Sequence, residues 1–294
     1  MPKLFLMLLL TPHLYGARVA VTIDDFAMRN GTALSLVQRD KRILAALEKY
    51  HIKAAAFVTG KYIQTPQVME RLGKWDKSGH LIANHTFSHP NFHKTELRVF
   101  EQDILKCEAL IGKFVNFTRL FRFPYLKAGD TREKRDGIRR FLEKHGYKYG
   151  HVTIDASDWY ISSRLESKLD RTANTPLEPY KRYYLDHIWE RAQYYNGLST
   201  RYLGREIDHT LLIHHNLLNA LFLDDLLGMF REKGWELIDA AVAFKDPVFD
   251  SKPNVLPAGE SLLWSLAKAK GDGSLRQPGE DSVYEKHRMD ERQL

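Results

Sequence analysis

Short apolar segments alternate with amphipathic segments along most of this chain, and this alternation limits the folds that it can adopt. The segment from Leu36 to Tyr50 has the spacing of a helix, and Thr65-Pro66 has the form of an N-cap followed by proline at the first helical position. Strands are expected at about residues 18–23, 54–58, 81–83, 120–123, 147–153, 210–213 and 235–238, and further helices at about 66–77, 95–111, 131–145 and 223–233.

Strands that alternate with helices favour a parallel sheet, and about seven such units favour a barrel of the (β/α) type. The 294 residues are enough for two domains of about 150 residues, but (β/α) barrels of about 250 residues often form one. We expect one barrel domain over residues 17–270 and a charged, flexible tail over residues 271–294. Residues 161–206 are interpreted as a helical insertion before the last catalytic strand, which either roofs the groove or packs on the barrel.

Residues 1–16 resemble a secretory signal peptide. Lys3 precedes an apolar run, Leu4 to Leu10, and the small residue Gly16 precedes Ala17. The run is too short for a transmembrane helix, which needs about 20 apolar residues, so no stable membrane insertion is expected. We expect a secreted or periplasmic protein. If the run is instead a buried strand or a leader that is not exported, the protein is cytoplasmic.

The composition restricts the partners and the metal chemistry of this chain. A single cysteine, Cys107, excludes a disulfide framework and an all-cysteine zinc site, so a bound metal must use carboxylates and some of the 13 histidines. The formal net charge of +7 suits an acidic polymer. This charge is spread along the chain and no nucleic-acid motif accompanies it, so no nucleic acid is expected as a partner. The sequence does not determine an oligomeric state.

Five of the expected strands end in polar side chains, and such ends gather the chemistry of parallel α/β proteins. The i, i+4 spacing of His85 and His89 lets both imidazoles meet one metal ion, with a carboxylate as third ligand, although two unrelated loop histidines would have the same spacing. The adjacent Asp24 and Asp25 can divide metal binding and base catalysis between them, or form a solvated turn. The strand-end groups are Asp24-Asp25, His85 to His89, Arg122 to Tyr125, Asp155 to Trp159 and His214-His215.

In their order along the chain, these groups resemble the five motifs of the polysaccharide deacetylase family, also called the NodB-homology domain or carbohydrate esterase family 4. The resemblance covers about residues 18–243. The family has Phe where Ile23 stands, and many members have Gly-Pro where Phe26-Ala27 stand, which leaves the shape of the first loop open. The motifs T-F-D-D, H-[ST]-x-x-H, R-x-P-[YF], D-x-x-D-W and L-x-[LI]-H match residues 22–25, 85–89, 122–125, 155–159 and 211–214.

The resemblance implies a distorted (β/α) barrel of about seven parallel strands and a metal-dependent deacetylase of N-acetylated sugars such as chitin or peptidoglycan. Asp25, His85 and His89 would hold one divalent ion, most often Zn²⁺, with Co²⁺, Ni²⁺ or Mn²⁺ as alternatives. Hydrolysis of another C–N or ester bond, as in acetyl-xylan or a small non-sugar amide, stays open. An inactive carbohydrate-binding protein would be marked by loss of Asp24 or His214, and both are present.

The resemblance also implies a role for each further motif residue. Asp24 would be the general base and His214 the general acid, roles that suit a carboxylate and an imidazole in amide hydrolysis. Arg122 would orient Asp24, and Asp158 would orient or tune His214. The Tyr125 backbone N–H would face the oxyanion. The acetyl pocket would be lined by Trp159, Leu211 and Tyr125.

Overall fold

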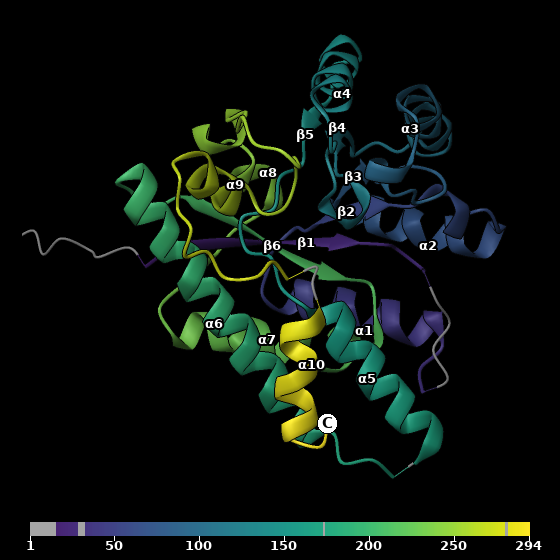
Figure 1. Cartoon of the computed structure of the whole chain (residues 1–294). Coiled ribbons are helices and arrows are strands. Elements are labelled where there is room, and N and C mark those ends of the chain that lie inside the picture. The colour runs from purple at the N-terminus through teal and green to yellow at the C-terminus, as the bar shows by residue number, and fades with distance from the viewer. Residues whose placement is uncertain (1–15, 29–32, 173, 280–281) are drawn as a thin grey trace, which may run out of the picture.

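The computed structural model describes residues 16–28, 33–172, 174–279 and 282–294, so the predicted signal peptide lies outside the described residues except for Gly16. The described residues form one seven-stranded parallel sheet, in the order β5-β4-β3-β2-β1-β6, with β7 paired to β1 beside β2 (Figure 1). The strands are β1 (Arg18–Asp24), β2 (Ala55–Val58), β3 (Leu81–Asn84), β4 (Phe117–Phe121), β5 (Lys148–Tyr149), β6 (Asp208–His214) and β7 (Glu236–Leu237).

The segment after β5 closes the sheet into a distorted barrel. The N–H of Gly150 donates to the Phe121 oxygen on β4, and four residues later Ile154 pairs with Leu211 on β6. Because this segment crosses from one strand to another, it forms regular pairing only over Lys148–Tyr149, a shorter strand than the expected 147–153. Gly150 is needed at the crossing, since a Cβ there would lie 2.4 Å from the ring of Phe57.

Helices follow most strands and cover the outside of the barrel. The expected helices are present, although the one expected at 223–233 begins six residues earlier, at Leu217. The Thr65 cap is confirmed, since its side chain accepts from the N–H of Val68. The short turns between them are 3-10 helices at Gly60–Tyr62, Phe92–Lys94, Pro124–Leu126 and Pro247–Asp250. The α-helices are α1 (Leu36–Lys49), α2 (Pro66–Lys77), α3 (Leu97–Ile111), α4 (Arg132–Lys144), α5 (Asp158–Arg171), α6 (Glu178–Leu203), α7 (Leu217–Glu232), α8 (Ala240–Ala243), α9 (Leu262–Ala269) and α10 (Ser282–Glu291).

Successive side chains of the strands enter two different cores, as the alternation along a strand requires. On β1, Val19, Val21 and Ile23 join the large core between the sheet and the helices. Ala20 faces the barrel interior with Phe57 and other residues of neighbouring strands. The same alternation places the side chains of Thr22 and Asp24, which follow Ala20 by two and four residues, on the interior side of β1.

The helical insertion packs on the barrel. Its long helix α6 carries four tyrosines that are buried in the large core: Tyr180, Tyr183, Tyr184 and Tyr195. The hydroxyl of Tyr184 donates to Asn219 Oδ1 on α7 at 2.5 Å. The insertion was expected either to roof the groove or to pack on the barrel. The buried tyrosines of α6 support packing on the barrel for this face of the helix.

Part of the charged C-terminal segment, residues 271–294, for which the composition predicts a flexible tail, forms a helix. Residues 282–291 form α10, which lies beside α5 and α6 (Figure 1). Met289 is fully buried, and so is Glu285, whose carboxylate meets groups on α6. Burial of one apolar side chain and pairing of one buried charge give this segment fixed contacts that charge density alone did not reveal.

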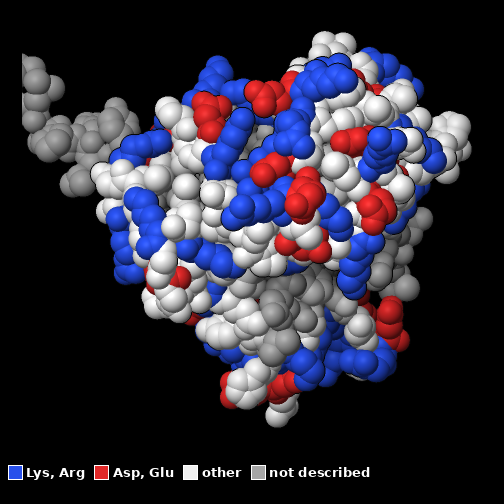
Figure 2. All heavy atoms as spheres, turned by 45° about the horizontal axis from the view of Figure 1, so that its top comes forward, with Lys and Arg blue, Asp and Glu red and all other residues white. Residues whose placement is uncertain are grey.

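On the face shown in Figure 2, Lys and Arg side chains are interspersed with Asp and Glu side chains. Among the described residues, no helix has the length and apolar character needed to span a membrane.

Candidate active site

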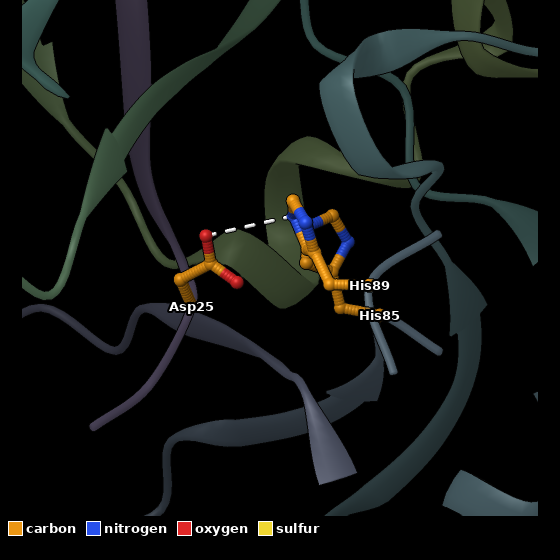
Figure 3. Close-up of side chains that lie close together, drawn as sticks. All are labelled: Asp25, His85 and His89. Carbon is orange, nitrogen blue, oxygen red and sulfur yellow. Dashed lines mark ion pairs between the residues drawn. The ribbon is translucent and has the colours of Figure 1, made fainter. Parts of the chain in front are cut away.

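Asp25, His85 and His89 lie close together at the carboxyl end of the sheet. Asp25 follows β1, and both histidines follow β3. One ligand atom from each residue lies within 4.8 Å of the other two, and Asp25 Oδ2 is 3.6 Å from His89 Nε2 (Figure 3). Two ligand atoms bound at about 2.05 Å to one tetrahedral ion are about 3.3 Å apart, so this spacing suits one ion.

The protonation of the histidines also fits a metal site. His85 Nδ1 is 2.9 Å from the Arg122 carbonyl oxygen, which can only accept, so Nδ1 carries the proton and Nε2 keeps its lone pair. Burial and the neighbouring His89 lower the pKa of His85 to about 3, and burial also lowers the pKa of His89. Both rings are therefore neutral, the form that binds metal. Thr59 Oγ1 donates to Asp25 Oδ1 at 2.8 Å and fixes the carboxylate.

The backbone at the strand ends is held in an unfavourable conformation. Asp25, Thr86, His89 and Tyr125 have φ angles of 57°, 67°, 59° and 57°. A left-handed conformation of this kind costs a non-glycine residue about 1–3 kcal/mol, and such residues cluster at functional sites. Strain therefore occurs at or beside the residues to which the resemblance assigns chemistry in the first three motifs.

A buried acid–arginine pair lies beside the metal-type cluster, which is the group Asp25, His85 and His89. Arg122 Nη1 donates to Asp24 Oδ1 at 2.7 Å and to Thr22 Oγ1 at 2.8 Å. The other oxygen of Asp24, Oδ2, is 3.7 Å from His85 Nε2. Burial raises the pKa of the Asp24 carboxyl, and Arg122 opposes that shift. Asp24 thus has one oxygen fixed by Arg122 and one directed at the cluster, an arrangement suited to accepting a proton there.

A buried acid–histidine pair faces Asp24 from the adjacent strand, since His214 pairs in register with Asp24. Its Nδ1 is 2.8 Å from Asp158 Oδ1, at the first residue of α5. Asp158 Oδ2 accepts from the His214 N–H and from the Asn216 and Asn219 side-chain amides, at 2.9, 2.8 and 2.7 Å. Burial acts to lower the pKa of His214, but Asp158 outweighs this effect and raises it to about 10. The imidazole therefore carries a proton at neutral pH.

Tyr125 and Trp159, two residues of the predicted site, have different neighbours in the structure. Tyr125 is 45% exposed, and its ring meets the ring of His89 edge-on, with centroids 4.6 Å apart. Trp159 Nε1 donates to the backbone oxygen of Gly279 at 3.3 Å. The first residue thus contacts the metal-type cluster, and the second contacts the C-terminal segment.

Leu211, which the resemblance places in the acetyl pocket, lies elsewhere. Its side chain is buried in the large core between the sheet and the helices, and its backbone oxygen accepts from Thr22 Oγ1. Leu212 instead forms a small cluster with Leu126 and Val152. Because side chains alternate along a strand, Leu212 shares its face of β6 with His214, and Leu211 points to the opposite face.

Several residues that hold the site were not identified from the sequence. Thr59 follows β2 and holds Asp25, and a polar residue at that strand end was the available signal. Asn216 caps α7 and Asn219 follows three residues later, a recognisable helix start. His215, next to the predicted acid, is buried against Phe26 and Trp75 as a core histidine.

The fold and the geometry together define a class of protein. It is a distorted (β/α) barrel that holds a carboxylate–bis-histidine cluster at the carboxyl ends of its strands. A carboxylate placed to accept a proton, Asp24, and a protonated histidine, His214, flank that cluster. Such an arrangement can hold a divalent ion and move protons on either side of it.

Comparison with known proteins finds a family match over slightly less than half of the chain. Residues 15–150 match the family model described as polysaccharide deacetylase, which confirms the resemblance shown by the motifs. A peptidoglycan-N-acetylglucosamine deacetylase of Bacillus cereus is 28% identical over 145 residues, which are 49% of this chain and 46% of that protein. An uncharacterised 30.6 kDa protein of Geobacillus stearothermophilus is 41% identical over 128 residues, 42% of this chain and 44% of that protein. Each alignment thus spans about half the length of the curated relative.

Solved structures share the fold beyond the region of the family match. The crystal structure of a polysaccharide deacetylase from Bacillus cereus superposes with a TM-score of 0.56 at 18% identity, covering 76% of this chain and 92% of that chain. The family match ends at residue 150, before Asp155, so the last two motifs lie outside it. This similarity at low identity supports the barrel fold and carries no information on substrate.

Proposed function

We propose that this protein is a metal-dependent deacetylase that removes acetyl groups from N-acetylated sugars of the chitin or peptidoglycan type. The observation that carries this proposal is the convergence of three groups at one end of the barrel. They are the Asp25–His85–His89 cluster, the Asp24–Arg122 pair and the Asp158–His214 pair. The relative that acts on peptidoglycan N-acetylglucosamine supports the substrate class.

Asp25, His85 and His89 would hold the ion, with Zn²⁺ as the first candidate. A bound divalent ion would polarise the acetyl carbonyl and lower the pKa of a water molecule towards about 7. Asp24 would accept the proton of the attacking water through the oxygen that Arg122 leaves free. Proton transfer to a positioned base contributes about 10²–10⁴-fold to rate.

His214 would then protonate the leaving amine. Its raised pKa, about 10, keeps the imidazole protonated until the amine departs, and Asp158 stabilises that charge. The backbone N–H of Tyr125 would donate to the oxyanion, a contact of a kind worth about 3–4 kcal/mol. Leu212, on the same face of β6 as His214, replaces Leu211 as the proposed apolar contact of the acetyl methyl group.

Acetylated polymers of this type lie outside the cytoplasm, so we propose a secreted or periplasmic enzyme, in agreement with the predicted signal peptide. N-terminal sequencing of the mature protein tests it, and export predicts that the mature chain lacks Leu4 to Leu10.

The proposed activity is tested by metal analysis of the purified protein, followed by acetate release from chitooligosaccharides, peptidoglycan fragments and acetyl-xylan. We expect about one divalent ion per chain and acetate release from at least one N-acetylated substrate. Release from acetyl-xylan alone would favour an esterase. Release from none of the three would favour a non-sugar amide or a binding protein without activity.

A further inference from the structure

The C-terminal segment contacts the D-x-x-D-W motif at one residue, Gly279. The N–H of Gly279 donates to Asp155 Oδ2 at 2.8 Å. Its carbonyl oxygen accepts from Ser157 Oγ at 2.8 Å and from Trp159 Nε1 at 3.3 Å. Gly279 lies at least 120 positions further along the chain, and it forms hydrogen bonds with three of the five residues of the motif.

This contact leaves no space for a side chain at residue 279. A Cβ built there would lie 2.8 Å from Asp155 Oδ1, 2.8 Å from the nitrogen of Ala156 and 2.9 Å from its carbonyl carbon. Two of these atoms belong to the backbone of the motif, so they cannot move aside as the end of a flexible side chain can. Adding even one methyl group at residue 279 would therefore force the segment and the motif apart.

A second contact reaches the same motif through α6. Glu285 on α10 is fully buried, with its carboxylate 2.5 Å from the Tyr183 hydroxyl, 3.3 Å from His187 Nδ1 and 3.6 Å from Arg191 Nη2. His187 Nε2 accepts from the backbone N–H of Ser157 at 2.9 Å, so the proton of this neutral ring is on Nδ1, towards Glu285. Arg191 also donates to the Gln277 oxygen at 2.8 Å.

Both contacts meet at Ser157, the residue that precedes Asp158. A serine at a helix start usually accepts a hydrogen bond from the first turn through its side chain, but Ser157 makes no such cap and donates to Gly279 instead. The start of α5 is therefore held by the C-terminal segment and by His187. Asp158 is its first helical residue, and its carboxylate holds His214 at 2.8 Å.

We propose that the C-terminal segment is a positioning element of the active site, in which Gly279 and Glu285 act through Ser157 to place the Asp158–His214 pair. This inference rests on the proposed function for its catalytic consequence, but not for its structural one. The residues concerned are positioning residues, since none of them contacts the site of the reacting groups. A displacement of about 1 Å in a catalytic group can cost about 10²-fold in rate.

The test compares Gly279→Ala with Gly273→Ala. Gly273 belongs to the same segment, has no atom within 4 Å of a built Cβ, and serves as the matched control. In the full chain, Gly279→Ala is expected to lower kcat about tenfold to a hundredfold with little change in KM, ion content or circular dichroism, whereas Gly273→Ala behaves as the unmodified protein. The Nδ1–H proton resonance of His214, assigned by its loss in His214→Gln, is expected to shift in Gly279→Ala alone.

The proposal is overturned if Gly279→Ala keeps its kcat within about twofold and leaves the His214 resonance in place. If Gly279→Ala fails to fold, Ser157→Ala decides, because it removes the bond to Gly279 without adding volume and is expected to shift the same resonance. If the unmodified protein releases no acetate from any substrate, the proposed function fails, and the resonance still tests the positioning role.

Discussion

The proposed active site draws on two regions that are built in different ways. In residues 16–150, the functional side chains hold one another: Arg122 binds Asp24 through its guanidinium and His85 through its carbonyl oxygen. In residues 151–294, the functional side chains depend on the insertion and on the C-terminal segment, through His187 and Gly279. The family model matches the first region and ends at its boundary.

The two regions also divide the chemistry. The first region contains the metal-type cluster and the proposed base, and the second contains the proposed acid and its partner. Variants in the first region should therefore change ion binding or proton acceptance. Variants in the second region should change proton donation and leave the ion in place.

The largest effect is expected for His85→Ala. Removal of one of two neutral imidazoles should abolish ion binding, and with it the several kcal/mol that an ion contributes, so that activity falls by about 10³-fold or more. Metal analysis and acetate release measure both. His145→Ala, whose ring packs against Phe141 on α4, is the matched histidine control and should retain the ion. An ion-loaded, active His85→Ala protein would refute the proposed ligand set.

Asp24→Asn should lower kcat by about 10²–10⁴-fold while the ion stays bound, because the amide keeps the shape of the carboxylate but accepts no proton. The melting temperature must be measured alongside, since Arg122 loses the charge of its buried partner. Undiminished acetate release by a folded Asp24→Asn protein would show that another group is the base.

In the second region, Asp158→Asn should leave the ion content unchanged and alter the titration of His214. The pKa of about 10 applies to the ion-free protein, in which Asp158, and more weakly Asp24 and Asp25, favour the imidazolium. Loss of the Asp158 charge should lower this pKa, so that His214 loses its proton at a lower pH and the alkaline limit of kcat moves in the same direction. Added divalent ion should also lower it, by repulsion between positive charges.

Nuclear magnetic resonance of ¹⁵N-labelled histidine measures this titration in the ion-free protein, and the pH profile of kcat measures its consequence. An equal pKa in the unmodified and Asp158→Asn proteins would remove the assigned link between the two residues. Ion loss in Asp158→Asn would show that the two regions are not separable.

The smallest effect is expected for Thr59→Val, which removes the hydroxyl that holds Asp25 Oδ1 and keeps the shape of the side chain. Loss of such an outer partner typically lowers metal affinity about 10–100-fold. At saturating ion, kcat should be unchanged. Thr65→Val is the matched control, since it removes the cap of α2 and should reduce stability by about 1 kcal/mol without changing ion affinity. Equal affinity in both variants would show that Thr59 does not support the site.

The sequence predicted the barrel, its strands and the motif residues because each of these depends on short-range pattern. Apolar runs mark strands, and polar groups at strand ends mark a site in a parallel sheet. It did not predict that the strand at 147–153 would shorten, because the crossing from β4 to β6 depends on where β6 lies. Nor did it distinguish Leu211 from Leu212, since both are apolar and only the direction of β6 side chains separates them.

The sequence by itself thus determined the chemical groups: two adjacent aspartates, two histidines four residues apart, an arginine and an acid–histidine pair. Only the tertiary structure decided what holds them. Thr59, Asn219, His187 and Gly279 are ordinary polar or small residues in the sequence, and they acquire a role because the fold brings them within hydrogen-bonding distance of the motifs. Hydrogen bonds depend on distance and angle in space, and no local pattern records a partner that lies between 30 and 122 residues away, as these do.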